Sequence, residues 1–207
     1  MASSTWAKQM SGKSRRGMGN PSVHLCDYHQ VRLDDSDFAS AKKEAADSPA
    51  EYADTMYANS LCTALVRRIV EDSKVTIPKS LAHDRAISMA MAMEDRLSAD
   101  SHSLEDYYKA MGTNEDQLIS EMEEAATKQL ESRAVLLAIA KTEGLEATDS
   151  EYQAEVRRLG MHYPLSFDEL DRFFHANGED VAIREDVSIE KASRLVTELA
   201  MAQDSER

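Results

Sequence analysis

The sequence is poor in glycine and proline, with 7 and 4 among 207 residues. Few tight turns are therefore available, which argues against an all-β fold. Two cysteines are too few for a disulfide framework and indicate a reducing compartment, most simply the cytoplasm. No apolar run approaches the roughly 18 residues that a membrane-spanning helix needs, so we expect no membrane partner. Aromatic residues make up only 6% of the chain.

The net charge of -14 is unevenly distributed. Residues 1–24 carry 4 basic and no acidic side chains, whereas the remainder carries 20 basic and 38 acidic ones. An acidic body repels nucleic-acid phosphates, so we expect no nucleic-acid partner. The basic start lacks the apolar segment of a secretory signal and the amphipathic stripe of a transit peptide. We therefore divide the chain into a disordered leader or remnant of an upstream domain, residues 1–32, and a helical domain, residues 33–207.

From Ser36 onward, start and stop signals predict consecutive helices and no strand, hence an all-α fold class. The expected helices cover residues 49–73 (capped by Ser48), 79–99, 103–112, about thirty residues from 113 ending before Gly144, a helix begun by Thr148 and ended by Tyr163-Pro164, a helix from Ser166 to Asn177-Gly178, and residues 181–201. Residues 134–140 are apolar all round, which predicts a place in the middle of the fold.

The motifs of common enzymes are absent from this sequence: there is no phosphate-binding glycine loop and no His-Glu-x-x-His. Residues 24–29 hold metal-ligand residue types, but no second set follows to complete a zinc site. Histidines 83, 102, 162 and 175 are scattered, and each is better explained by packing or surface exposure than by catalysis. We expect no catalytic residue, no metal and no cofactor. A hydrolase assembled from dispersed carboxylates and histidines is the weakest of our hypotheses.

Methionine is the unusual feature, with 11 residues. Met89, Met91 and Met93 fall in one expected helix, and Met111 and Met122 follow in the next two. Flexible, polarizable side chains of this kind are overused at promiscuous binding surfaces. Core packing is the better explanation for any single methionine, whereas the group favours a soft binding face.

Several motifs follow one another along the chain: residues 33–39 (LDDSDFA), residues 75–81 (VTIPKSL), and residues 134–145 (AVLLAIAKTEGL) followed by residues 148–151 (TDSE). In this order they resemble the C-terminal domain of bacterial trigger factor. Lys191-Ala192 and the last apolar helix fit the end of that domain. The resemblance covers about residues 33–201.

The resemblance implies an ATP-independent chaperone module, with a fold related to the chaperone domain of SurA. In it, an elongated helical body carries two protruding helical arms that cradle unfolded or nascent polypeptides. By position, residues 78–129 would form the first arm and residues 148–177 the second. We expect substrate contacts at Met89, Met93, Leu97, Tyr107, Tyr108, Met111, Leu118 and Met122 in the first arm, and at Phe173 and Phe174 in the second.

The chain departs from the family pattern in its N-terminal part. The ribosome-docking signature is missing, so we expect no ribosome docking, and the prolyl isomerase domain has no room here. The chain is therefore expected to be a truncated homologue or a fragment without enzymatic activity. Its sequence is compatible with a homodimer. The alternative function is an all-helical scaffold for one dedicated protein partner.

Overall fold

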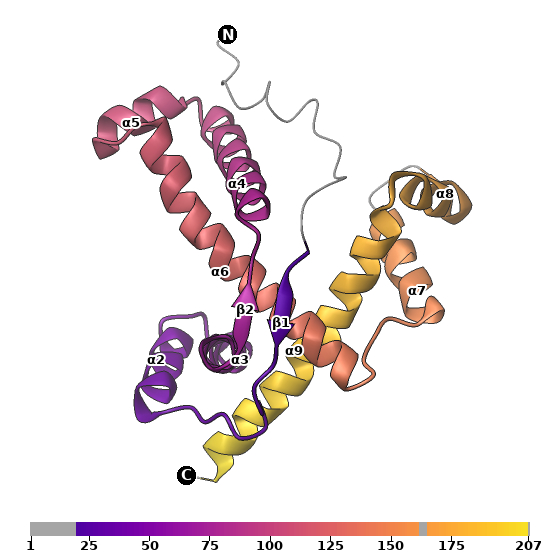
Figure 1. The fold of residues 1–207 in the computed structure, drawn as a ribbon. Coiled ribbons are helices and arrows are strands. Elements are labelled where there is room, and N and C mark those ends of the chain that lie inside the picture. The colour runs from indigo at the N-terminus through magenta and orange to yellow at the C-terminus, as the bar shows by residue number, and fades with distance from the viewer. Residues whose placement is uncertain (1–19, 162–164, 207) are drawn as a thin grey trace. The chain divides into compact units, whose positions relative to one another are not determined.

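The computed structural model describes residues 20–161 and 165–206, and over these residues the predicted all-helical fold is confirmed (Figure 1). The helices are α2 (Asp35–Ala46), α3 (Ala53–Asp72), α4 (Lys79–Ala99), α5 (Leu104–Met111), α6 (Glu115–Thr142), α7 (Asp149–Gly160), α8 (Phe167–Asn177) and α9 (Glu179–Ser205). Strands β1 (Ser22–His24) and β2 (Lys74–Thr76) form a two-stranded sheet. None of the helices in the described ranges is long and apolar enough to cross a membrane.

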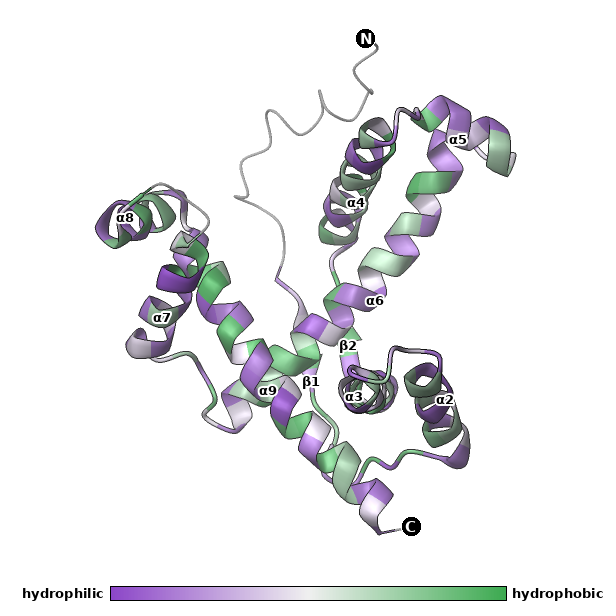
Figure 2. Cartoon of the chain, turned by 180° about the vertical axis from the view of Figure 1, so that it is seen from behind, coloured by the Kyte–Doolittle hydropathy of each residue, from purple (hydrophilic) through white to green (hydrophobic). Residues whose placement is uncertain are grey.

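The described chain divides into two compact units, which we call the first and second units. The first unit holds residues 20–22 and 75–132, and the second holds residues 23–74 and 133–206, so that α6 contributes to both. Within the first unit, α4 runs beside the first part of α6, and α5 lies at their far ends (Figures 1 and 2).

The second unit is organised around α3, whose Leu61, Leu65 and Ile69 are fully buried. Helices α2 and α9 both pack against α3, and α7 and α8 pack on each other and on α9. The segment 134–140 of α6 lies in this unit with five of its seven residues buried, which confirms its predicted central position.

An ion-pair network fastens α2 to α3. Asp37, 5% exposed, accepts hydrogen bonds from Arg67 (2.7 Å) and from Arg68 Nε (2.8 Å). Arg68 also pairs with Asp34, the N-cap of α2. The Ser36 hydroxyl and the backbone N–H of Asp37 hold the pKa of Asp34 well below its usual range, and Arg68 adds to this. The network joins residues about thirty positions apart. No local sequence signal predicts such pairs.

Most predicted helix ends are confirmed by local geometry. Ser103, Thr148 and Ser166 each form a reciprocal capping box with an acidic residue three positions later. Gly112 (φ 64°) and Gly178 (φ 68°) adopt the left-handed conformation that ends α5 and α8. Helix α4 has the predicted bounds, whereas α9 extends two residues earlier and four residues later than predicted.

The predicted start of the helix over residues 49–73, which is α3, was wrong. Helix α3 begins at Ala53, four residues later than expected, with Tyr52 as its N-cap. Ser48 does not cap it, because its hydroxyl donates to the carbonyl of Glu44 (2.8 Å) near the end of α2. The predicted helix end at Tyr163-Pro164 falls outside the described residues, and α7 ends at Gly160.

The expectation that no strand forms was also wrong, because β1 and β2 pair over three residues each. Segments so short show too little alternation to be recognised in the sequence. Most of the expected leader lies outside the described residues. Residues 23–32, which we assigned to it, belong instead to the second unit: Tyr28 and Val31 are buried, and the Tyr28 hydroxyl donates to Glu143.

Candidate functional site

The first unit contains an apolar cluster that gathers most of the predicted first-arm residues. Its buried members are Ile87, Ala90, Leu104 and Leu118. Partly buried side chains pack around them: Met91, Met93, Leu97, Tyr107, Tyr108, Ile119 and Met122. The structure therefore brings five predicted residues, Met93, Leu97, Tyr107, Tyr108 and Met122, around one cluster. They are partly accessible, as a soft binding face requires, and partly packed.

The other three predicted first-arm residues lie in different environments. Leu118 is 4% exposed and fills the cluster, so its side chain supports the unit from inside. Met89 is half-buried on α4, outside the cluster. Met111, at the end of α5, is 64% exposed and presents its thioether chain to solvent.

Helix α5 is held in place by local chemistry. The Ser103 hydroxyl and the backbone N–H of Ser103 donate to Asp106, which lowers the pKa of that carboxyl. The rings of Tyr107 and Tyr108 meet edge to face, with centroids 6.3 Å apart. Burial raises the pKa of Tyr108, and the nearby Glu115 and Glu94 carboxylates raise it further.

The second-arm residues lie on α8, which packs on α7 and α9. Tyr152, Val156, Leu170 and Phe174 form a buried cluster there. Phe174 is 8% exposed and belongs to this core, whereas the adjacent Phe173 is 52% exposed. The two rings contact each other at 5.9 Å between centroids, so the exposed ring rests on the buried one. The sequence does not distinguish these two neighbours, and only the packing of α8 does.

Further exposed apolar side chains flank α7 and α8, and the sequence reasoning missed them. They are Met161 (82% exposed), Leu165 (46%) and Val181 (56%). We refer to these three residues and Phe173 together as the α7–α8 surface, after the helices that they belong to or flank. For Met161 and Leu165 the available signal was an apolar residue directly after a helix end or just before a helix start, where no helical face is left to bury it. Val181 lies in the first turn of α9 and gives no such signal.

Tyr152 contacts the two helices that neighbour α7. The hydroxyl of Tyr152 donates to Asp171 (2.9 Å), and the guanidinium of Arg184 lies 4.4 Å from the centre of its ring. Burial, followed by the bond to Asp171, raises the pKa of Tyr152 to about 12. These contacts join α7, α8 and α9, so the helix that carries Phe173 is held in place.

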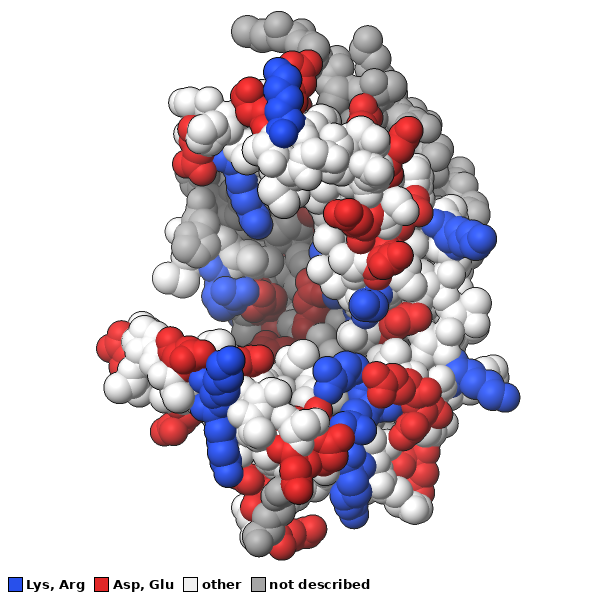
Figure 3. Space-filling model, turned by 90° about the vertical axis from the view of Figure 1, so that its left-hand side faces the viewer, with Lys and Arg blue, Asp and Glu red and all other residues white. Residues whose placement is uncertain are grey.

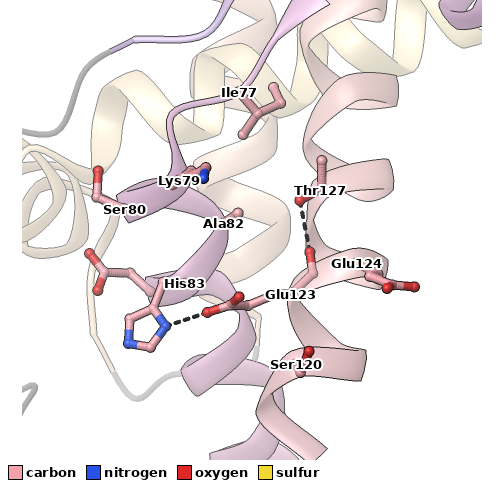
Figure 4. Close-up of a pocket in the computed structure, with 10 residues that line it drawn as sticks. Ile77, Lys79, Ser80, Ala82, His83, Ser120, Glu123, Glu124 and Thr127 are labelled. Atoms are coloured by element: carbon pink, nitrogen blue, oxygen red, sulfur yellow. Dashed lines mark hydrogen bonds and ion pairs between the residues drawn. The ribbon is translucent and has the colours of Figure 1, made fainter. Parts of the chain in front are cut away.

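A groove of about 650 Å³ lies between the start of α4 and the middle of α6 (Figure 4). Ile77 and Ala82 supply apolar lining, and Glu123, Glu124 and Asp84 supply carboxylates. His83 Nδ1 lies 2.5 Å from a Glu123 carboxylate oxygen, as the dashed line in Figure 4 shows. The groove therefore combines an apolar lining with acidic side chains, and an ion pair crosses it from α4 to α6 when His83 is protonated.

Charged side chains of both signs are spread over the face shown in Figure 3. Figure 3 shows acidic and basic groups interspersed over one face of the molecule, with uncharged areas between them. In the first unit, residues 75–132 carry 12 acidic and 5 basic side chains. The first unit is therefore acidic on balance.

Two of the four scattered histidines lie beside acidic side chains. His83 pairs with Glu123, and His175 lies 3.3 Å from Asp171. The first pair joins α4 to α6, and the second lies within α8. Across the described ranges, no group of three or more His, Cys, Asp or Glu side chains is arranged to hold a metal ion.

Comparison with known proteins gives a consistent result. A family model of the bacterial trigger factor protein C-terminus matches residues 39–198. The trigger factor of Macrococcus caseolyticus is 31% identical over 170 residues, which are 81% of this chain and 39% of that protein. That of Bacillus pumilus is 26% identical over 196 residues, covering 87% of this chain and 46% of the relative. The chain thus spans less than half the length of these curated relatives.

A solved structure of the trigger factor chaperone, from work on promiscuous substrate recognition in folding and assembly, is also similar. It shares 16% identity with this chain at a TM-score of 0.45 and covers 72% of this chain and 36% of that one.

Proposed function

Because the chain belongs to the family of bacterial trigger factor C-terminal domains, we propose that it is an ATP-independent chaperone module that binds unfolded or nascent polypeptides. The observation that carries the proposal is the exposure of large apolar side chains on an acidic helical scaffold. Met111, Met161 and Phe173 are each more than half exposed. Exposed apolar side chains of this size are suited to contacts with another chain.

The proposed substrate contacts divide between the two apolar surfaces. In the first unit they are made by Met89, Met93, Leu97, Tyr107, Tyr108, Met111 and Met122. On the α7–α8 surface they are made by Met161, Leu165, Phe173 and Val181. Leu118 and Phe174 hold these surfaces in shape from the core beneath them.

Weak contacts of this kind suit a chaperone. Each apolar side chain contributes little to affinity, because the bound segment loses conformational freedom. Two surfaces on one chain raise the overall affinity without raising selectivity, since the second contact becomes intramolecular. The proposed module acts by reversible binding alone, with no cofactor and no covalent step, in the cytoplasm. Dissociation then needs no ATP.

The test is suppression of aggregation. The chain at an equimolar ratio is added to several unrelated chemically denatured proteins on dilution, without ATP, and light scattering is followed. We expect slower aggregation of most of them. Suppression of one protein alone would support a scaffold for a dedicated partner instead, and no suppression would refute the proposal.

A matched pair of variants connects the test to the surfaces. Met111→Ser removes an exposed thioether chain from the first unit, whereas Met201→Ser removes one that is 38% exposed near the end of α9. We expect Met111→Ser to weaken suppression and Met201→Ser to leave it unchanged. Equal loss of aggregation suppression in both variants would show that the position of an exposed methionine does not matter, and would contradict a binding surface at Met111.

A further inference from the structure

The groove between α4 and α6 offers an apolar lining bordered by acid. Ile77 and Ala82 line it together with three carboxylates, those of Asp84, Glu123 and Glu124. Lys79 and His83 also line it, and His83 lies beside Glu123, so acidic side chains outnumber the one lysine. All these residues belong to the first unit, so the groove is formed within one compact part of the chain. An extended segment that carries positive charge beside apolar side chains complements such a groove.

The chain contains a segment of that composition at its own N-terminus. Residues 1–19 carry Lys8, Lys13, Arg15 and Arg16 with no acidic residue. Apolar side chains alternate with these charges, including Trp6 and Met10. The rest of the chain has 20 basic against 38 acidic residues, so this stretch is net positive while the remainder is net negative.

The residues to which this segment is joined belong to the same unit as the groove. Residues 20–22 belong to the first unit, and β1, which begins at Ser22, pairs with β2. Helix α4 begins three residues after β2 ends, and the groove starts there with Ile77 and Lys79. Nineteen residues span up to about 63 Å when extended, about twice the roughly 32 Å length of α4. The segment is therefore long enough to follow the groove.

We propose that residues 1–19 dock in the α4–α6 groove of the same chain, with their basic side chains on the carboxylates of Asp84, Glu123 and Glu124. A tether this short gives an effective concentration on the order of millimolar, so even weak intrinsic affinity produces substantial occupancy. Attraction between exposed charges is screened by salt, so docking weakens as ionic strength rises. If the proposed chaperone function holds, the docked segment competes with substrates for the first unit.

The experiment uses Trp6, the single tryptophan of the chain, as a probe in the full-length protein. Acrylamide quenching of its fluorescence is compared with that of a synthetic peptide of residues 1–19. We expect Trp6 to be several-fold less accessible in the protein at low salt, and to approach the accessibility of the peptide at high salt. Quenching equal to that of the peptide at low salt would overturn the proposal.

A pair of variants tests the place of docking. Asp84→Lys with Glu124→Lys reverses the charge of the groove, while Glu71→Lys with Glu198→Lys makes the same change at exposed positions of the second unit. We expect the groove variant alone to raise quenching to the level of the peptide. Equal effects of both variants would overturn the groove as the site, and loss of protection on dilution would overturn docking within one chain.

Circular dichroism is used to check that each variant is folded. If a variant does not fold, the salt titration of the unaltered protein tests the docking proposal. No substrate is used, so a failure here is distinct from a failure of the proposed function.

Discussion

The neighbours Phe173 and Phe174 allow the sharpest test of the client-binding surface, because they share one helix but not one environment. Phe174 is 8% exposed, so about nine tenths of its roughly 200 Å² is removed from water. At about 25 cal/mol per Å² this corresponds to about 4–5 kcal/mol, within the range of about 3–5 kcal/mol for Phe→Ala in a core. Phe173 is 52% exposed, which gives about half that value as an upper bound.

We therefore expect opposite outcomes from two alanine variants. Phe174→Ala should lower the free energy of unfolding strongly, because it leaves a cavity between α7, α8 and α9. Phe173→Ala should stay folded and lose much of its ability to suppress aggregation. Urea unfolding followed by circular dichroism measures the first effect, and light scattering with denatured substrates measures the second.

Two results would refute this reasoning. If Phe173→Ala destabilises the protein as much as Phe174→Ala does, Phe173 is part of the core and not of a binding surface. If Phe173→Ala keeps both stability and full aggregation suppression, the α7–α8 surface does not bind substrates.

Three further predictions concern the first unit, the ion pairs and pH. Met89→Ser with Met93→Ser should stay folded and weaken aggregation suppression at low and high salt alike, since apolar contacts are little screened; early melting would show that both side chains are core. Asp37→Asn should lower the free energy of unfolding in urea by about 1.5–3 kcal/mol, whereas the exposed control Glu71→Gln should change it little; equal effects would discount the α2–α3 network. The pKa of Glu151 is lowered to about 2, first by the backbone N–H of Thr148 and then by Lys191. The contribution of the ionised Glu151 to the free energy of unfolding is therefore present above pH 4.5 and is lost as the pH falls toward 2. The stability difference between the protein and Glu151→Gln should therefore shrink over that range in acid titrations, and a constant difference would contradict this.

Local chemistry made the helix boundaries predictable. A capping box such as that at Ser103 or Thr148 involves residues three positions apart, and a glycine such as Gly112 ends a helix through its own backbone conformation. Both signals act within one helical turn, so the sequence alone contains them. Ser48 shows the limit, because its hydroxyl had two possible partners and bonded to the preceding helix.

The sequence by itself determined the all-helical class, most helix boundaries, the central place of residues 134–140 and the motifs that resemble the trigger factor family. Only the tertiary structure decided which apolar side chains are exposed. Phe173 and Phe174 are chemically identical, and the packing of α8 on α7 and α9 buries one and exposes the other. The same holds for His83 and Glu123, forty positions apart, which meet only when α4 lies beside α6. Burial and pairing depend on contacts between distant segments, and helical periodicity within one segment cannot specify them.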